Sequence, residues 1–307
     1  MGSRMTRLHP ELDKHSGKRV RGGKHVRKKG RYLVAALAVV LLALLIWPFL
    51  EARSLTVTEL TVKVENLPDN MNNLRIAYVT DIHAYTGPYG SQASVDGMIH
   101  RVNTLNADLV LLGGDYSTDT EGAIRFFRSS QAFTANQAVA GVIGETDLEN
   151  DSRLAELQSA MLGAGVVPLI NNVEAVRIGS GTLYIAGLDD CNAGTPDIAA
   201  VSSRLKESDT VILLSHSPEI LPQVYSTRDK EGGVHWFDLV LCGHTHGGKA
   251  RFVTLSLTSP LKTAQKYMSG VFTDNRATEI VSRGVGMTGL PVRVMCRPEI
   301  YLITLTK

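Results

Sequence analysis

The chain has 307 residues, 44% of them apolar, and its 32 Lys or Arg against 30 Asp or Glu leave a net charge of +2. This is the composition of a globular protein with a sizeable core, so it excludes a chain that is too polar to fold. The three cysteines (Cys191, Cys242 and Cys296) are widely spaced and odd in number. They indicate neither a disulfide framework nor a cysteine-based zinc site.

The positive charge is concentrated at the N-terminus. Residues 1–31 contain eleven Lys or Arg and two acidic residues, a net charge of +9, so the rest of the chain carries −7. We predict a basic tail over residues 1–31. Because this tail adjoins an apolar segment, where anionic lipid attracts basic side chains, we expect a membrane contact and no nucleic-acid partner.

Residues 32–50 contain no charged side chain. As a helix these nineteen residues would span roughly 28 Å at about 1.5 Å each, close to the hydrocarbon thickness of about 30 Å. We predict one transmembrane helix here. The positive-inside rule then leaves the tail in the cytoplasm and the chain after Glu51 on the outer side. A cleaved signal peptide, cut near Glu51 and Ala52, is the alternative, and the length of the apolar run favours the anchor.

The remaining residues, 54–307, show strands alternating with helices, which predicts one layered α/β domain. The predicted strands are residues 55–65, 74–83, 107–115, 138–147, 166–170, 182–190, 210–219 and 237–246, followed by paired strands over 292–306. The predicted helices are residues 94–105, 122–133, 152–162 and 198–206.

Several of the predicted strands end in Asp, His or Gly, so polar groups are expected along one edge of a sheet, where α/β folds bind ligands. Side chains two residues apart in an extended chain point to the same side, which predicts that Asp81 converges with His83 and His244 with His246. Each residue alone is typical of a cap or turn. Imidazoles and carboxylates together suit Mn, Fe or Zn, and six ligands exceed the needs of one zinc, which favours two divalent metal ions. The six are Asp81, His83, Asp115, His216, His244 and His246.

Four motifs carry a resemblance to a known family. T-D-I-H (80–83), G-G-D (113–115), L-L-S-H-S-P-E (213–219) and L-C-G-H-T-H-G-G-K (241–249) resemble the calcineurin-like metallophosphoesterases, and most closely their bacterial, membrane-associated YkuE/YaeI-like branch. The resemblance extends to G-L-D-D (187–190) and to residues 282–300. It implies a two-layer β-sandwich flanked by helices, in which metal-activated water hydrolyses phosphodiester or pyrophosphate bonds.

By the same resemblance, the first metal would be held by Asp81, His83 and His246. Asp115 would bridge the two metals, and His216 and His244 would hold the second. Asp115, His216 and His244 would then act in catalysis through the metals.

The family's G-N-H-D motif is replaced by G-E-T-D at residues 144–147. The resemblance places Glu145 where an Asn ordinarily ligates the second metal, and Thr146 where a His ordinarily stands beside the leaving group. Glu145 is a candidate ligand, although it is longer and charged. Thr146 is no acid near neutral pH, so an acid–base contribution of about 10²- to 10⁴-fold would be missing. Asp147 is expected to cap the following helix.

The sequence therefore predicts a membrane-anchored, dinuclear-metal phosphoesterase with a phosphoester or pyrophosphate substrate, including lipid-linked or cell-envelope ones. The alternative is a metal-binding surface protein whose catalysis is impaired by the G-E-T-D motif. No obligate protein partner is evident from the sequence.

Overall fold

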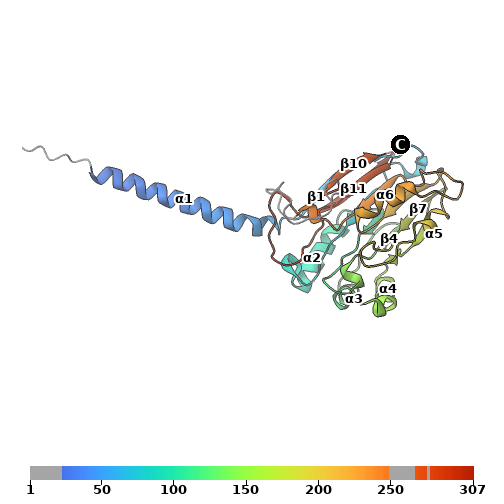
Figure 1. The fold of residues 1–307 in the computed structure, drawn as a ribbon, viewed down its shortest axis with the longest axis horizontal. Helices are drawn as coiled ribbons and strands as arrows, with labels where there is room; N and C mark the ends of the chain where they lie inside the picture. Colours follow the sequence, from blue (N-terminus) through green and yellow to red (C-terminus); the bar gives the residue numbers. More distant parts are fainter. Residues whose placement is uncertain (1–22, 249–266, 275–276) are drawn as a thin grey trace, which may run out of the picture. The chain divides into compact units, whose positions relative to one another are not determined.

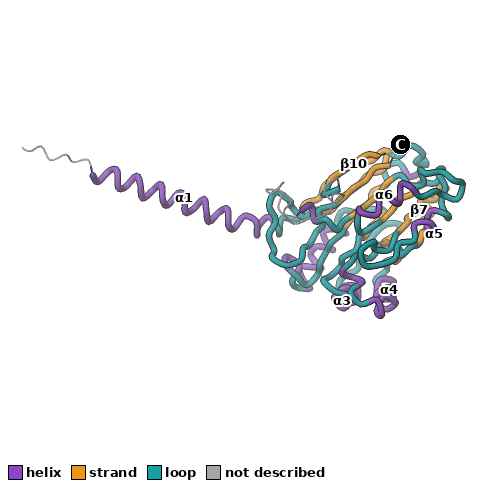
Figure 2. The backbone as a smooth tube through the Cα atoms, in the orientation of Figure 1, coloured by secondary structure: helices purple, strands orange, loops and turns teal. Residues whose placement is uncertain are grey.

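The computed structural model describes residues 23–248, 267–274 and 277–307, drawn as a ribbon in Figure 1 and as a backbone tube in Figure 2. Its helices are α1 (Gly23–Glu51), α2 (Gln92–Asn103), α3 (Thr120–Ser129), α4 (Leu154–Gly163), α5 (Ile198–Ser202) and α6 (Leu221–Ser226). Its strands are β1 (Thr56–Lys63), β2 (Arg75–Val79), β3 (Leu109–Leu112), β4 (Ala138–Gly141), β5 (Val167–Pro168), β6 (Asn172–Ile178), β7 (Gly181–Gly187), β8 (Thr210–Leu214), β9 (Leu239–Cys242), β10 (Gly270–Asp274), β11 (Ala277–Val281) and β12 (Glu299–Thr306).

The chain divides into two compact units between Ile46 and Trp47. Most of helix α1 belongs to the first unit. An 18-residue window within Arg31–Glu51 has a mean hydropathy of 2.8 and no buried residue, so this one described helix is long and apolar enough to cross a membrane. The predicted span at 32–50 falls inside it, whereas residues 1–22 of the predicted tail lie outside the described residues.

The second unit contains two six-stranded sheets, ordered β1-β12-β2-β3-β4-β5 and β10-β11-β9-β8-β7-β6. The neighbours β2, β3 and β4 run parallel, with Val79 paired to Leu112 and Leu112 paired to Gly141. Strands β8 and β9 are also parallel. The carboxyl ends of each parallel group therefore meet at one edge of their sheet.

The two sheets pack face to face around a shared core, in which Ile76 and Leu109 of the first sheet join Ile185 and Leu214 of the second. Helices α2, α3 and α4 cover the outer face of the first sheet, and α5 and α6 cover that of the second. Because both faces of the central strands are covered, β3 and β8 are buried along their whole length, as continuous apolar runs predict. The expected two-layer sandwich flanked by helices is confirmed.

Several bounds of the predicted elements were wrong; the helix predicted over 198–206, for example, ends at Ser202. The strand predicted over 292–306 begins only at Glu299, because the buried guanidinium of Arg293 donates to the carbonyl oxygens of Gly284, Gly286 and Cys296 and folds this segment into a loop. Helix α3 ends at Ser129, earlier than predicted, where Ser130 turns to an extended conformation. Strands β6, β10 and β11 were not predicted at all.

Candidate metal centre

All six predicted ligands lie on loops that follow the carboxyl ends of buried strands. Asp81 and His83 come after β2, and Asp115 comes after β3. His216 follows β8, and the pair His244 and His246 follows β9. The two sheets therefore contribute to one site from facing edges.

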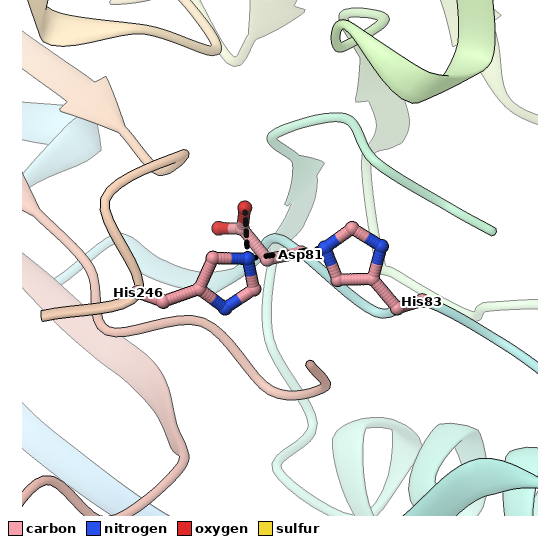
Figure 3. A group of neighbouring side chains, drawn as sticks. All are labelled: Asp81, His83 and His246. Atoms are coloured by element: carbon pink, nitrogen blue, oxygen red, sulfur yellow. Dashed lines mark hydrogen bonds and ion pairs between the residues drawn. The ribbon is translucent and has the colours of Figure 1, made fainter. Parts of the chain in front are cut away.

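The first cluster consists of Asp81, His83 and His246, all of them buried, with ligand atoms within 4.8 Å of one another (Figure 3). His83 Nε2 lies 3.1 Å from His246 Nε2, which in turn lies 3.6 Å from Asp81 Oδ1. The two imidazole rings are stacked, with centroids 5.0 Å apart. Three candidate ligands, one carboxylate and two imidazoles, thus converge on one point from two distant stretches of the sequence.

The second cluster consists of Asp115, His216 and His244, again within 4.8 Å of one another. His216 Nε2 lies 3.3 Å from Asp115 Oδ2, and the His216 and His244 rings meet edge to face with centroids 5.2 Å apart. Glu145 stands at the rim, with its Oε2 4.0 Å from His244 Nδ1 and its side chain 53% exposed. The structure thus brings six of the predicted ligands into two clusters and leaves Glu145 just outside the second.

Asp115 lies between the clusters and uses its two oxygens differently. Its Oδ2 lies 3.6 Å from His83 Nε2 in the first cluster and 3.3 Å from His216 Nε2 in the second. Its Oδ1 accepts a hydrogen bond from the backbone N–H of Thr146 at 3.0 Å, and the Thr146 hydroxyl lies 2.9 Å away. One carboxylate oxygen is therefore directed at both clusters while the other is held by the surrounding protein.

Backbone carbonyl oxygens orient two of the imidazoles. His83 Nδ1 lies 3.2 Å from the Ser117 carbonyl oxygen, and His216 Nδ1 lies 2.8 Å from that of Gly113. A proton on Nδ1 satisfies each carbonyl and leaves the Nε2 lone pair directed into the site. This is the second contact that metal-ligating histidines ordinarily make.

The backbone at the ligands departs from the extended conformation that the sequence predicted. Asp81, His83, Asp115, His244 and His246 all have positive φ, between 43° and 66°. Side chains two residues apart do converge, but they do so because the chain turns sharply at each ligand and not because it is extended. Such left-handed residues cost about 1–3 kcal/mol each and gather where surrounding contacts enforce them, commonly at functional sites.

Glycine permits the close approach of these turns. A Cβ on Gly243 would lie 2.5 Å from Asp81 Oδ2, where the backbone N–H of His244 already donates to the Asp81 carboxylate. A side chain on Gly144 would meet the Asp115 carboxylate. Glycine is therefore needed at positions 144 and 243, because any side chain there would collide with a carboxylate of the site.

Charges within the site perturb its titration. Burial alone would raise the pKa of Asp115, but the positive charges of His216 and His83 outweigh it and lower that pKa. Burial likewise opposes protonation of His216, yet the Asp115 carboxylate raises the pKa of that imidazole well above its usual value. Burial lowers the pKa of His83. The Asp115 carboxylate thus favours the protonated form of His216, and a metal ion bound by the His216 nitrogen would displace that proton.

The donor set fits divalent cations. Among the described residues, His216 Nε2 is a buried nitrogen without a hydrogen-bond partner, although it faces Asp115. Two nitrogens bound to one cation at about 2.0–2.1 Å lie roughly 2.9–3.4 Å apart, and the observed His83–His246 separation of 3.1 Å falls in that range. Mixed imidazole and carboxylate ligands suit Mn, Fe or Zn.

Asp147 does not cap a helix, contrary to the prediction. Its buried carboxylate accepts hydrogen bonds from the backbone N–H groups of Asp115 at 2.8 Å, Gly144 at 2.9 Å and Tyr116 at 3.0 Å. Helix α4 begins later, at Leu154. Asp147 thus ties the loop after β3 to the loop after β4, a role that no local sequence signal indicated.

Comparison with known proteins shows which protein family the chain is similar to. Residues 74–248 match the family model described as calcineurin-like phosphoesterase, a stretch that exceeds half of the chain and contains all six residues of the two clusters. The chain is 28% identical over 267 residues to the Bacillus subtilis protein named uncharacterized metallophosphoesterase YkuE, covering 84% of this chain and 87% of that protein. The expected resemblance to this family is confirmed.

One further curated protein and one solved structure are also similar to the chain. A Danio rerio protein named transmembrane protein with metallophosphoesterase domain is 26% identical over 263 residues, which are 81% of this chain and 57% of that protein. Among solved structures, a dimetal phosphatase from Danio rerio has 13% identity and a TM-score of 0.42, covering 76% of this chain and 99% of that one.

Proposed function

The chain belongs to the calcineurin-like phosphoesterase family of metal-dependent phosphoester hydrolases, and from this premise we propose a membrane-anchored, dinuclear enzyme that hydrolyses phosphodiester or pyrophosphate bonds. In this proposal residues 1–31 form a cytoplasmic tail, residues 32–50 cross the membrane and residues 54–307 carry the chemistry on the outer side. The metal ions are Mn, Fe or Zn, held by Asp81, His83 and His246 and by Asp115, His216 and His244, with Glu145 as an added ligand of the second.

The observation that carries the proposal is the position of Asp115 Oδ2. It lies 3.6 Å from His83 Nε2 and 3.3 Å from His216 Nε2, so one carboxylate oxygen faces the donors of both clusters. An arrangement with a single metal would leave one of the two clusters without a bound cation. Two cations that share Asp115 satisfy both triads.

Bound divalent cations would supply Lewis-acid stabilisation of charge on phosphoryl oxygens and lower the pKa of bound water. The protein contributes orientation. Left-handed backbone turns and carbonyl contacts from Ser117 and Gly113 fix the imidazoles, and Thr146 holds the oxygen of Asp115 that does not face the clusters. The side chains of His244 and Glu145 are partly exposed, at 26% and 53%, so a substrate would approach from their side.

The proposal is tested with the full chain in detergent, stripped of metal and supplied with Mn²⁺. Hydrolysis of bis(p-nitrophenyl) phosphate and metal content by mass spectrometry are compared between wild type and Asp115→Ala. We expect turnover in the wild type and a loss on the order of 10²- to 10³-fold or more in the variant. Asp197→Asn, which keeps a side-chain acceptor at the start of α5, is the matched control. A wild-type protein that binds no divalent metal would contradict the proposal.

A second candidate function is a metal-binding surface protein with impaired catalysis. The observation that favours it is the position of Thr146, whose hydroxyl contacts Asp115 Oδ1 and the Ser117 carbonyl oxygen and so is directed at the protein itself. No imidazole is supplied by this motif. The double substitution Glu145→Asn, Thr146→His separates the two functions: a large gain in hydrolysis over a silent wild type favours the binding protein, and an active wild type favours the enzyme.

Anchoring is supported by the apolar helix and by relatives named as transmembrane proteins, and the proposed orientation by the basic residues of 1–31. Retention of the helix is favoured over cleavage near Glu51, because the Glu51 carboxylate is buried and accepts the backbone N–H of Cys296 at 2.6 Å. An outer-side body near the bilayer would suit lipid-linked or cell-envelope phosphoesters. Protease treatment of intact cells tests the orientation, since the body should be digested while a label on the tail is protected.

A further inference from the structure

The segment of residues 286–297, between β11 and β12, is bound to the last turn of helix α1 within the second unit. The backbone N–H of Arg293 donates to the Pro48 carbonyl oxygen at 3.0 Å. The backbone N–H of Cys296 donates to the buried carboxylate of Glu51. Two hydrogen bonds therefore fix this segment to the point where the apolar run of the helix ends.

The same segment also holds the first ligand cluster. The Arg293 guanidinium, which is fully buried, donates to the Gly286 carbonyl oxygen at 2.6 Å, and the Gly286 N–H donates to the Asp81 carbonyl oxygen at 2.6 Å. The Cys296 thiol lies 3.3 Å from the His246 carbonyl oxygen. The end of the apolar helix and two candidate ligands are thus connected through one continuous set of buried contacts.

Two large apolar side chains of this segment face solvent. Leu290 is 68% exposed and Met295 is 56% exposed, although Arg293 and Cys296 of the same segment are buried. Exposed cations accompany them at Arg297 and, just after the helix, at Arg53. Apolar side chains flanked by basic ones are the combination that binds the boundary between acyl chains and anionic headgroups.

The place where helix α1 ends indicates that lipid covers this surface. The uncharged run of α1 ends at Leu50, so in a membrane-anchored chain Pro48, two residues earlier, lies at the boundary between the acyl chains and the headgroups. A segment hydrogen-bonded to Pro48 must lie at nearly the same level. Exposed apolar side chains there meet lipid, whereas elsewhere on the body they would meet water.

We propose that residues 286–297 form a membrane-contact surface, with Leu290 and Met295 inserted at the headgroup level and Arg53 and Arg297 facing anionic headgroups. This inference rests on the anchoring part of the proposed function and goes beyond it. It makes the bilayer a second attachment of the body, in addition to the helix, and places the first ligand cluster beside the lipid surface.

The test uses the full chain in vesicles of phosphatidylcholine and phosphatidylglycerol. A single cysteine is introduced at residue 290 or 295 in a Cys191→Ser background and labelled with the environment-sensitive fluorophore NBD. Cys242 and Cys296 are buried, so they are not expected to react, and the background protein without a new cysteine checks this. The matched control carries the label at residue 162 of α4, where Leu162 is 60% exposed.

We expect labels at 290 and 295 to emit at shorter wavelength and to be quenched by lipids with a nitroxide near the top of the acyl chain. The label at 162 should stay unquenched. Quenching at 290 and 295 no greater than at 162 would overturn the proposal. Thermal unfolding of each labelled protein identifies any that fails to fold. If one of the labels at 290 and 295 prevents folding, the quenching of the other label decides the test. The readout needs no hydrolysis, so a failed phosphoesterase assay and a failed membrane contact remain distinguishable.

Discussion

Thr146 is hydrogen-bonded to Asp115 through both its backbone N–H, at 3.0 Å, and its hydroxyl, at 2.9 Å, and both contacts go to the same carboxylate oxygen. The opposite oxygen of Asp115 faces His83 and His216. Thr146 stands where the family motif has a histidine, and in this chain its position makes it a support of the Asp115 carboxylate. From the sequence, Thr146 was noted only because it cannot replace the histidine as an acid. In the structure its hydrogen bonds hold the Asp115 carboxylate in place.

Replacement of Thr146 by Val should weaken metal binding. Val has nearly the same shape but cannot donate to Asp115, and loss of such a supporting contact typically costs about 10- to 100-fold in affinity. Thr146→Ser keeps the hydroxyl and should bind metal within a few fold of wild type. Mn²⁺ titration by calorimetry measures both variants. Equal affinity of the Val variant and wild type would show that the backbone N–H of Thr146 suffices.

Asp147→Asn should destabilise the fold. The Asp147 carboxylate accepts three backbone N–H groups, and burial, together with the charge of Asp115, raises its pKa to about 7. An amide has one oxygen, and its NH₂ group would face a donor, which leaves a buried group unsatisfied at a cost of about 1–3 kcal/mol. A fall in Tm of roughly 2–4 °C for each kcal/mol follows for a body of this size.

The control for this experiment is Asp197→Asn, because Asn caps a helix as well as Asp does. Thermal unfolding of both variants is followed by circular dichroism in the presence of a chelator, so that metal binding does not contribute. If the two variants unfold at the same temperature, the contacts of Asp147 do not stabilise the loops.

Gly243→Ala should reduce both stability and metal affinity, because its Cβ would lie 2.5 Å from Asp81 Oδ2 and displace a candidate ligand. Gly97→Ala is the control, and the opposite effect on stability is expected for it. Gly97 lies in helix α2 with nothing within 4 Å of its would-be Cβ, so alanine should stabilise by up to about 1 kcal/mol. Urea unfolding of both variants checks the signs, and a neutral Gly243→Ala would show that the Asp81 loop yields to the methyl group.

The fold was predictable where local pattern and tertiary environment agree. Strand β3 is an uninterrupted apolar run because both of its faces are buried, and helix α2 was placed to within two residues at each end because apolar side chains recur at helical spacing. The loop at residues 292–298 was read as strand because its apolar residues alternate, but the buried Arg293 guanidinium binds the carbonyl oxygens of Gly284 and Gly286, and Met295 has a positive φ of 53°. A contact of that kind depends on partners distant in sequence.

The candidate site was predictable in its residues and not in its geometry. Six candidate ligands could be named from their order at successive strand ends, and the structure brings them into two clusters of three. The left-handed turns at Asp81 and His246 were missed, because a positive φ outside glycine is enforced by surrounding contacts and leaves no compositional signal. The role of Asp147 was missed for the same reason, since its donors lie up to 32 residues away.

Asp238 should make stability depend on pH. Burial raises its pKa to about 6, opposed by the Val211 N–H that it accepts at 2.8 Å. The unfolded value is about 3.9, so the folded chain holds the proton more tightly, and this stabilisation is complete below about pH 4 and lost as the pH rises through about 6. Asp238→Asn stays neutral and keeps an oxygen for Val211. Its free energy of unfolding should exceed that of wild type at pH 8 by on the order of 2 kcal/mol, and the excess should vanish near pH 4.

Urea unfolding of wild type and Asp238→Asn at both pH values measures this difference directly. Other titrating groups contribute equally to the two proteins, so only the excess is attributed to residue 238. An excess that is the same at pH 4 and pH 8 would assign the effect to packing and not to ionisation.

Arg293→Lys should be among the most damaging conservative substitutions in the body. The guanidinium donates to the Arg283 carbonyl oxygen at 2.9 Å and to those of Gly286 and Gly284 at 2.6 and 3.2 Å, and the side chain is fully buried. A lysine ammonium cannot reproduce the planar fork, so buried carbonyl groups lose partners at about 1–3 kcal/mol each. Because Gly286 in turn donates to the Asp81 carbonyl oxygen, metal affinity at the first cluster should fall as well.

Arg204→Lys is the matched control, since Arg204 is exposed and also makes two hydrogen bonds, to Asn172 and to the Val173 carbonyl oxygen. Water replaces a lost partner at that surface, so its stability should change by less than about 0.5 kcal/mol. The two variants are compared by urea unfolding without metal and by Mn²⁺ titration. If Arg293→Lys lowers stability but leaves metal affinity unchanged, the prediction for metal binding is wrong. The contacts from Arg293 through Gly286 to Asp81 would then stabilise the fold without affecting metal binding at the first cluster.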